Sequence, residues 1–151
     1  MSQQVQKKVQ GAASDTVRET DPNVQQGKAS RPDYSVWVTA SAGTGKTKVL
    51  TDRILRLLLP GADGRPGTNA AKILCLTYTK AGAGEMAIRL SNTLTRWAIA
   101  PEEELRAELK KLQNREPGQP DLDKARQLFA EVADTPGGIK ILTIHSFCQS
   151  V

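Results

Sequence analysis

The sequence predicts an α/β fold in which a parallel sheet is flanked by helices. Three runs of apolar and β-branched residues, at positions 35–40, 72–77 and 139–144, have the length and composition of buried parallel strands. Each run leads into a segment whose apolar residues recur at helical spacing. Strands that alternate with helices favour a layered sheet that binds its ligands at the carboxyl ends of the strands.

Helical spacing continues between the second and third runs. The apolar residues Met86, Leu90, Leu94 and Trp97 mark one face of a helix of about sixteen residues, a pattern typical of core packing. Two further helices are expected, marked by Leu105, Leu109 and Leu112 and by Ala125, Leu128, Phe129 and Val132, with turn-forming residues 116–120 between them. We therefore expect a helical insertion over about residues 98–134.

The first part of the chain has a different composition. Residues 1–19 are rich in Gln, Ser, Thr and Lys and hold few large apolar side chains, which predicts a disordered leader. Thr20, Asp21 and Pro22 then provide the start signals of a short helix that reaches Ala29.

Composition narrows the class of protein only slightly. The 151 residues carry a formal charge of +5, spread along the chain, which is typical of a solvated surface with a mild preference for polyanions. Cys75 and Cys148 lie in apolar stretches without metal-ligand spacing, so both are expected to be reduced core residues. With neither a secretion signal nor an apolar run of about 18 residues, we expect a cytoplasmic protein.

A glycine-rich turn closed by Lys-Thr lies between the first predicted strand and an amphipathic helix. Small residues let the backbone wrap an anion, while the lysine reaches the β/γ-phosphates and the threonine holds Mg²⁺. Ala40 replaces the first glycine of the usual pattern, so the entry to the loop should avoid positive φ. A turn that merely starts a helix is the weaker alternative. The expected phosphate-binding residues are Ala40, Ser41, Ala42, Gly43, Thr44, Gly45, Lys46 and Thr47.

Two more motifs, at residues 77–86 and 143–149, follow the second and third predicted strands. With the glycine-rich turn they resemble, in order, motifs I, Ia and Ib of superfamily 1, UvrD-like DNA helicases, in which alanine is common at the position of Ala40. The stretches at residues 38–50 and 135–140 are similar to AddA-type helicase–nuclease subunits, which are RecB-like. The resemblance covers about residues 22–151.

This resemblance implies a partial RecA-like P-loop NTPase domain over residues 20–151, the N-terminal part of an ATP-binding helicase domain. It implies ATP and Mg²⁺ as cofactors and adenine recognition by Gln26, with Gln25 as the competing register. It also implies an ATP-dependent helicase that acts on DNA ends in double-strand break repair, with an AddB-type partner subunit. The DNA-contacting residues would be Tyr78, Thr79, Lys80, His145 and Ser146.

Several alternatives stay open. Periodicity alone would favour Tyr78 as a cap on the core, and a lone histidine such as His145 is more often structural than catalytic. Trp37 and Phe147 are expected to pack in the core. Because these residues include no Asp-Glu strand or arginine finger, we expect a fragment that is itself inactive. The rival functions are a nucleotide- and DNA-binding module without turnover and a P-loop ATPase or kinase of a small molecule.

Overall fold

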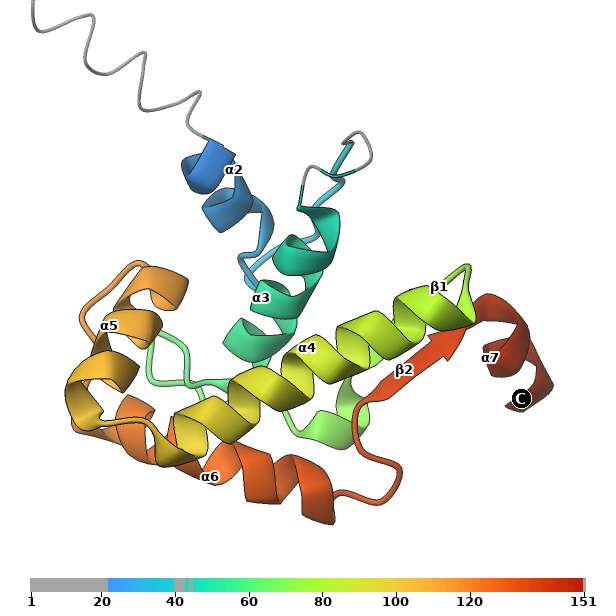
Figure 1. The fold of residues 1–151 in the computed structure, drawn as a ribbon. Coiled ribbons are helices and arrows are strands. Elements are labelled where there is room, and N and C mark those ends of the chain that lie inside the picture. Colours follow the sequence, from blue (N-terminus) through green and yellow to red (C-terminus); the bar gives the residue numbers. More distant parts are fainter. Residues whose placement is uncertain (1–21, 40–42, 44, 151) are drawn as a thin grey trace, which may run out of the picture.

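A long helix crosses the molecule and joins a helical end to a small sheet in the computed structural model, which describes residues 22–39, 43 and 45–150 (Figure 1). The predicted leader at residues 1–19 lies outside the described residues. The elements, in chain order, are α2 (Pro22–Ala29), α3 (Lys46–Leu58), the 3₁₀ turn η1 (Ala70–Lys72), β1 (Leu74–Thr77), α4 (Lys80–Ile99), α5 (Glu102–Gln113), α6 (Gln119–Asp134), β2 (Lys140–Thr143) and α7 (Ile144–Ser150).

The second and third predicted strands are present and parallel. In the register of the sheet, Leu74 lies opposite Lys140 and Thr77 lies opposite Thr143. A parallel pair needs a long crossover connection, and α4, α5 and α6 form it here. The prediction of an α/β fold with parallel strands is confirmed in this mixed, two-stranded form.

The first predicted strand is wrong for residues 35–39, which form no strand; position 40 lies outside the described residues. Trp37 is 93% exposed, so its predicted packing role is wrong as well. The main-chain carbonyls of Arg31 and Tyr34 accept hydrogen bonds from Arg53 of α3. The segment before the loop is therefore held along a helix, where its β-forming composition has no neighbouring strand to pair with among the described residues.

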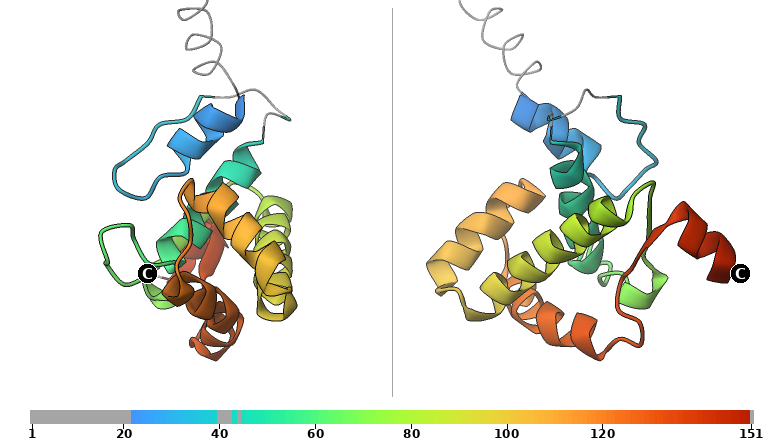
Figure 2. Two further views of the ribbon diagram at one scale, coloured as in Figure 1. Left: turned by 90° about the vertical axis from the view of Figure 1, so that its left-hand side faces the viewer. Right: turned by 45° about the vertical axis from the view of Figure 1, so that its right-hand side comes forward.

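The core lies among the helices. Met86, Leu90, Leu94 and Trp97 are all buried on one face of α4, as predicted. Helix α6 packs on both α4 and α5, and Figure 2 shows α5 and α6 gathered near the C-terminal end of α4. The predicted helices over this region are confirmed, although Phe129 is 41% exposed while Leu128, one position earlier, is buried.

The two faces of the sheet differ. Cys75 and Ile141 pack against the core beneath α4, whereas Leu74 and Leu76 on the opposite face are 44% and 46% exposed. Alternate residues of a strand point to opposite faces. The prediction of strands buried on both faces is therefore wrong for the outer face, because α4 covers only the inner one.

The last helix holds two further corrections. Helix α7 has no buried residue: Cys148 is exposed and Phe147 is only half-buried. The helix contacts the short strands but reaches none of the large helices closely enough to bury a side chain. Cys75 is half-buried on the inner sheet face, and burial raises the pKa of its thiol.

Candidate functional site

The glycine turn has the backbone geometry that its sequence predicts. Gly43 and Gly45 have φ values of 80° and 84°, in the left-handed region that favours glycine. Gly45 precedes the first residue of α3, whose first turn contains no acidic side chain. The first amides of a helix lack partners within the helix, and its dipole is positive there, so this end attracts anions. The predicted loop residues Ala40, Ser41, Ala42 and Thr44 lie outside the described residues.

The two lysines at the start of α3 have different surroundings. The Lys48 ammonium forms an ion pair with Asp52 at 2.5 Å, one turn further along the helix. Lys46 lines a cleft beside the turn. Thr47, between them, has a carbonyl that accepts a hydrogen bond of 2.9 Å from the Thr51 hydroxyl. Lys46 is therefore the lysine that faces a potential ligand.

This cleft, with a volume of about 500 Å³, has the size of a small-molecule site. It lies between α2, the exposed segment before the turn and the first turn of α3. Its walls hold both apolar and hydrogen-bonding groups, as a site for a base and its phosphates requires. The lining residues are Gln25, Gln26, Lys28, Ala29, Tyr34, Val36, Trp37, Val38, Thr39, Lys46 and Val49.

The glutamine of α2 lies against the glycine turn. A methyl group placed on Gly45 would lie 3.0 Å from Nε2 of Gln26, and the three atoms nearest to it all belong to the Gln26 side chain. Gln25 lines the same cleft. Contact with Gly45 supports Gln26 over Gln25 as the residue that reads a bound base next to the phosphate turn.

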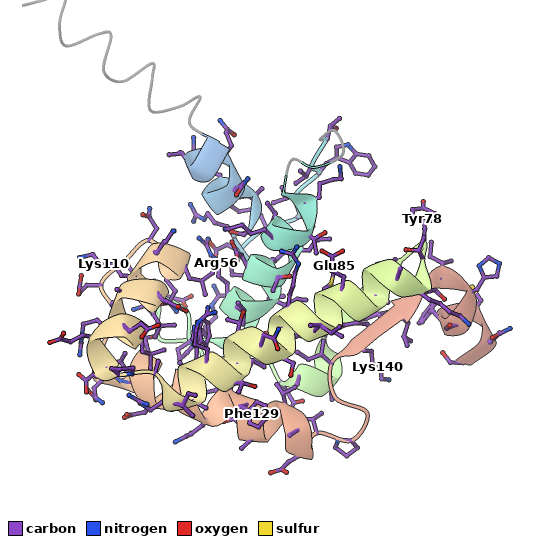
Figure 3. The ribbon with its side chains drawn as sticks, viewed as in Figure 1. Arg56, Tyr78, Glu85, Lys110, Phe129 and Lys140 are labelled. Carbon is purple, nitrogen blue, oxygen red and sulfur yellow. The ribbon has the colours of Figure 1, made fainter. Side chains whose placement is uncertain are left out.

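A second group of predicted residues follows the ends of the strands. Because Thr77 is paired with Thr143, residues 78 and 144 leave the sheet at the same edge. Tyr78 is 91% exposed and projects from the tip between β1 and α4 (Figure 3). This exposure contradicts the alternative in which Tyr78 caps the core.

Thr79 and Lys80 begin α4. The Thr79 hydroxyl accepts a hydrogen bond of 3.0 Å from the Gly82 amide, and its carbonyl accepts one of 2.8 Å from Thr77 Oγ1. Thr79 is therefore the N-cap of the helix. Lys80 is exposed at its first position, two residues after Tyr78.

Thr143 holds the start of α7 in the same way. Its side chain is buried, and Oγ1 accepts a hydrogen bond of 3.1 Å from the Ser146 amide and lies 2.8 Å from Ser146 Oγ. The Ser146 hydroxyl is thus engaged within the chain, while His145 is exposed. The capping role of Thr143 was not predicted, although a threonine between a strand and a helix is a recognisable cap signal.

Comparison with known proteins adds the family. The model of the UvrD/REP helicase N-terminal domain matches residues 22–151. The chain belongs to this family. The helicase resemblance carried by the three motifs is thereby confirmed. No solved structure matches the UvrD/REP chain.

The relatives of the UvrD/REP chain share one name. The AddA proteins, named as subunits of an ATP-dependent helicase/nuclease, are 35% identical to it in Carboxydothermus hydrogenoformans, over 76% of this chain and 8% of the relative. The values in Desulforudis audaxviator are 35%, 79% and 8%, and in Lactobacillus acidophilus 38%, 45% and 5%. The predicted similarity to AddA-type proteins is confirmed, and the chain spans less than a tenth of the length of these relatives.

The described residues hold neither a metal cluster nor a membrane span. Within them, no group of three or more His, Cys, Asp or Glu side chains could bind a metal ion. Nor does any helix within the described ranges have the length and apolar character needed to cross a membrane.

Proposed function

We propose that this chain is the ATP-binding and first DNA-contacting part of an AddA-type helicase, with a RecA-like architecture. The observation that carries the proposal is the positive-φ glycine turn before Lys46 and Thr47, in contact with Gln26 beside a cleft of about 500 Å³. Membership of the UvrD/REP family and the names of the relatives support the same function. The full protein would act on DNA ends in double-strand break repair, in the cytoplasm and with an AddB-type partner.

In this proposal the nucleotide spans α2 and the start of α3. Gln26 would hydrogen-bond the adenine, and Lys46 would bind the phosphates together with the amides of residues 40–45. The Thr47 hydroxyl is a hard oxygen donor, as Mg²⁺ prefers, and no acidic cluster competes with it among the described residues. Mg²⁺, when bound, would neutralise phosphate charge.

The strand-end residues would contact single-stranded DNA. An exposed aromatic ring such as Tyr78 can stack on any base, as a motor that passes every sequence requires. Thr79, Lys80, His145 and Ser146 would contact the sugar–phosphate backbone. A small-molecule kinase has no evident use for this exposed edge, so the helicase function is favoured over that alternative.

Nucleotide binding is tested by substitution of Lys46. We expect Lys46→Ala to weaken Mg-ATP binding by about 1.5–3 kcal/mol, because a charge-assisted contact with phosphate is lost. Calorimetric titration measures the change. Lys48→Ala is the matched control, since Lys48 is paired with Asp52. Equal ATP affinities for the wild type and Lys46→Ala would contradict the proposal.

DNA binding is tested at the strand ends by fluorescence anisotropy with single-stranded DNA. We expect Tyr78→Ala to cost about 1–3 kcal/mol per stacked base, largely regardless of sequence. Lys80→Ala should lower the slope of log K against log salt by somewhat under about one unit, if one phosphate contact is lost. Lys111→Ala, on the distant helix α5, is the matched control. Unchanged binding curves for both Tyr78→Ala and Lys80→Ala would contradict the DNA-contacting role.

A further inference from the structure

Two arginines of α3 hold the segment that precedes the glycine turn. Arg53 donates from Nη2 to the Tyr34 carbonyl at 2.9 Å and from Nη1 to the Arg31 carbonyl. Arg56, one turn further along, donates from Nη1 to the Gly27 carbonyl at 3.1 Å. All three carbonyls belong to α2 or to the segment that follows it, and α3 is the helix that begins at the phosphate turn.

The Arg56 contact lies in a specific and partly buried environment. Gly27 is in the last turn of α2, where the helix dipole is negative and favours a cation. The Gly27 carbonyl also accepts a hydrogen bond from the hydroxyl of Ser30, which is 1% exposed. Arg56 lies near the end of α2 (Figure 3). Its contact therefore clamps the end of α2 against α3.

Keeping Arg56 there is costly. Its Nε atom is buried and has no hydrogen-bond partner among the described residues, and burial lowers the pKa of its guanidinium. A surface arginine would avoid this cost by turning toward water. The side chain is thus held by packing around α3, so its contact with Gly27 defines one position of α2.

We propose that Arg53 and Arg56 are positioning residues that set the distance between Gln26 and the phosphate turn, and so couple base recognition to phosphate binding. Gln26 is the immediate neighbour of Gly27, and its amide lies against Gly45. Neither arginine lines the cleft between α2 and α3, so any effect on the base would pass through Gln26. This inference rests on the proposed function, in which Gln26 reads adenine.

The test separates the base from the phosphates. Mg-ATP, Mg-GTP and Mg-tripolyphosphate are titrated against the whole chain as wild type, Arg53→Ala and Arg56→Ala. The wild type should prefer ATP over GTP, and each variant should lose about tenfold in ATP affinity, the effect of one charge-assisted bond. Tripolyphosphate should bind the variants with unchanged affinity, because it lacks a base. In a Gln26→Ala background, Arg56→Ala should cause no further loss.

Arg106→Ala is the matched control, because Arg106 also donates to a main-chain carbonyl, that of Pro117, at a place remote from the cleft. Its ATP preference should equal that of the wild type. Circular dichroism checks the fold of each variant. If Arg56→Ala unfolds, Arg56→Lys decides instead, since it keeps the charge and most of the stem but loses the planar fork.

Three outcomes would overturn the inference. A wild-type preference for ATP that survives in both arginine variants would remove the coupling while leaving the proposed function intact. Equal losses for all three ligands would indicate general loosening and not positioning of Gln26. A wild type that binds no triphosphate, or whose affinities do not respond to Lys46→Ala, would overturn the proposed function itself.

Discussion

At the scale of single residues, a buried ion pair ties two turns together outside the cleft. The Asp121 side chain is 7% exposed and accepts hydrogen bonds from Arg115 at 2.6 and 2.8 Å and from the Gly118 amide at 2.8 Å. Arg115 also reaches the Pro60 carbonyl at 3.4 Å. Burial opposes ionisation of Asp121, but the bonds from Arg115 and Gly118 outweigh it and lower the pKa. The pair joins the turn before α6 to the loop after α3.

This pair predicts a pH-dependent stability. Because the pKa of Asp121 is lower in the folded state, its contribution is complete above the unfolded value and is lost as pH falls through the folded one. We expect Asp121→Asn to lower the free energy of unfolding by about 2 kcal/mol at neutral pH. The difference from the wild type should shrink below about pH 4, near the ordinary aspartate pKa.

Urea unfolding at pH 7, 5 and 3 measures these differences. Asp123→Asn is the matched control, because Asp123 is exposed on the same helix and accepts a hydrogen bond of 2.9 Å from the neutral amide of Gln119. It should change stability by less than about 0.5 kcal/mol. A loss in Asp121→Asn that stayed constant from pH 7 to pH 3 would contradict the assignment.

At the scale of elements, α4 links the proposed DNA contacts to the core. Its N-terminal residues carry those contacts, and its C-terminal half carries Trp97, whose indole Nε1 donates to Glu108 of α5 at 2.7 Å. Arg96 forms an ion pair with the same carboxylate at 2.9 Å. The exposed tip with Tyr78 is thereby mounted on a helix that is anchored at its other end.

The cap of α4 predicts a graded effect. Thr79→Ala removes the acceptor of the Gly82 amide and should cost about 1 kcal/mol of stability, whereas Thr79→Ser should keep most of it. Thr93→Ala is the control, because Thr93 lies within the helix and its hydroxyl donates back to the Arg89 carbonyl. It should be neutral or slightly stabilising, since alanine is the better helix former. Equal melting temperatures for Thr79→Ala and Thr93→Ala would refute the capping role.

At the scale of the whole molecule, the helices are well packed and the sheet is half covered. The side chains of Leu105, Leu109 and Ala125 have no exposed surface, whereas the outer sheet face presents Leu74 and Leu76 to solvent. Exposed apolar strands are sites of association between molecules. We therefore expect the outer face to promote self-association of the chain.

A pair of substitutions on adjacent strands tests this asymmetry. Leu76→Thr should change the free energy of unfolding by less than about 0.5 kcal/mol and reduce the binding of an apolar dye. Ile141→Thr, on the inner face, should cost about 1–3 kcal/mol because it places a hydroxyl against the core. Chemical unfolding and dye fluorescence measure the two effects. Equal destabilisation by both substitutions would show that both faces are covered.

The sequence by itself determined the local features. Helical spacing predicted the buried face of α4 and the helices that follow, and the glycine positions predicted the left-handed turn before Lys46. The runs before Tyr78 and Ile144 predicted two parallel strands. These features depend on neighbours within a few residues, where periodicity and the steric freedom of glycine act directly.

Only the tertiary structure decided how these parts meet. Residues 35–39 have strand composition but follow a segment that is held by Arg53 of α3, and the exposure of Leu76 follows from which sheet face α4 covers. The contact of Gln26 with Gly45, and the clamp of Arg56 on Gly27, join positions about twenty to thirty residues apart. Such contacts depend on the packing of one helix against another, which the spacing of residues along a single element does not encode.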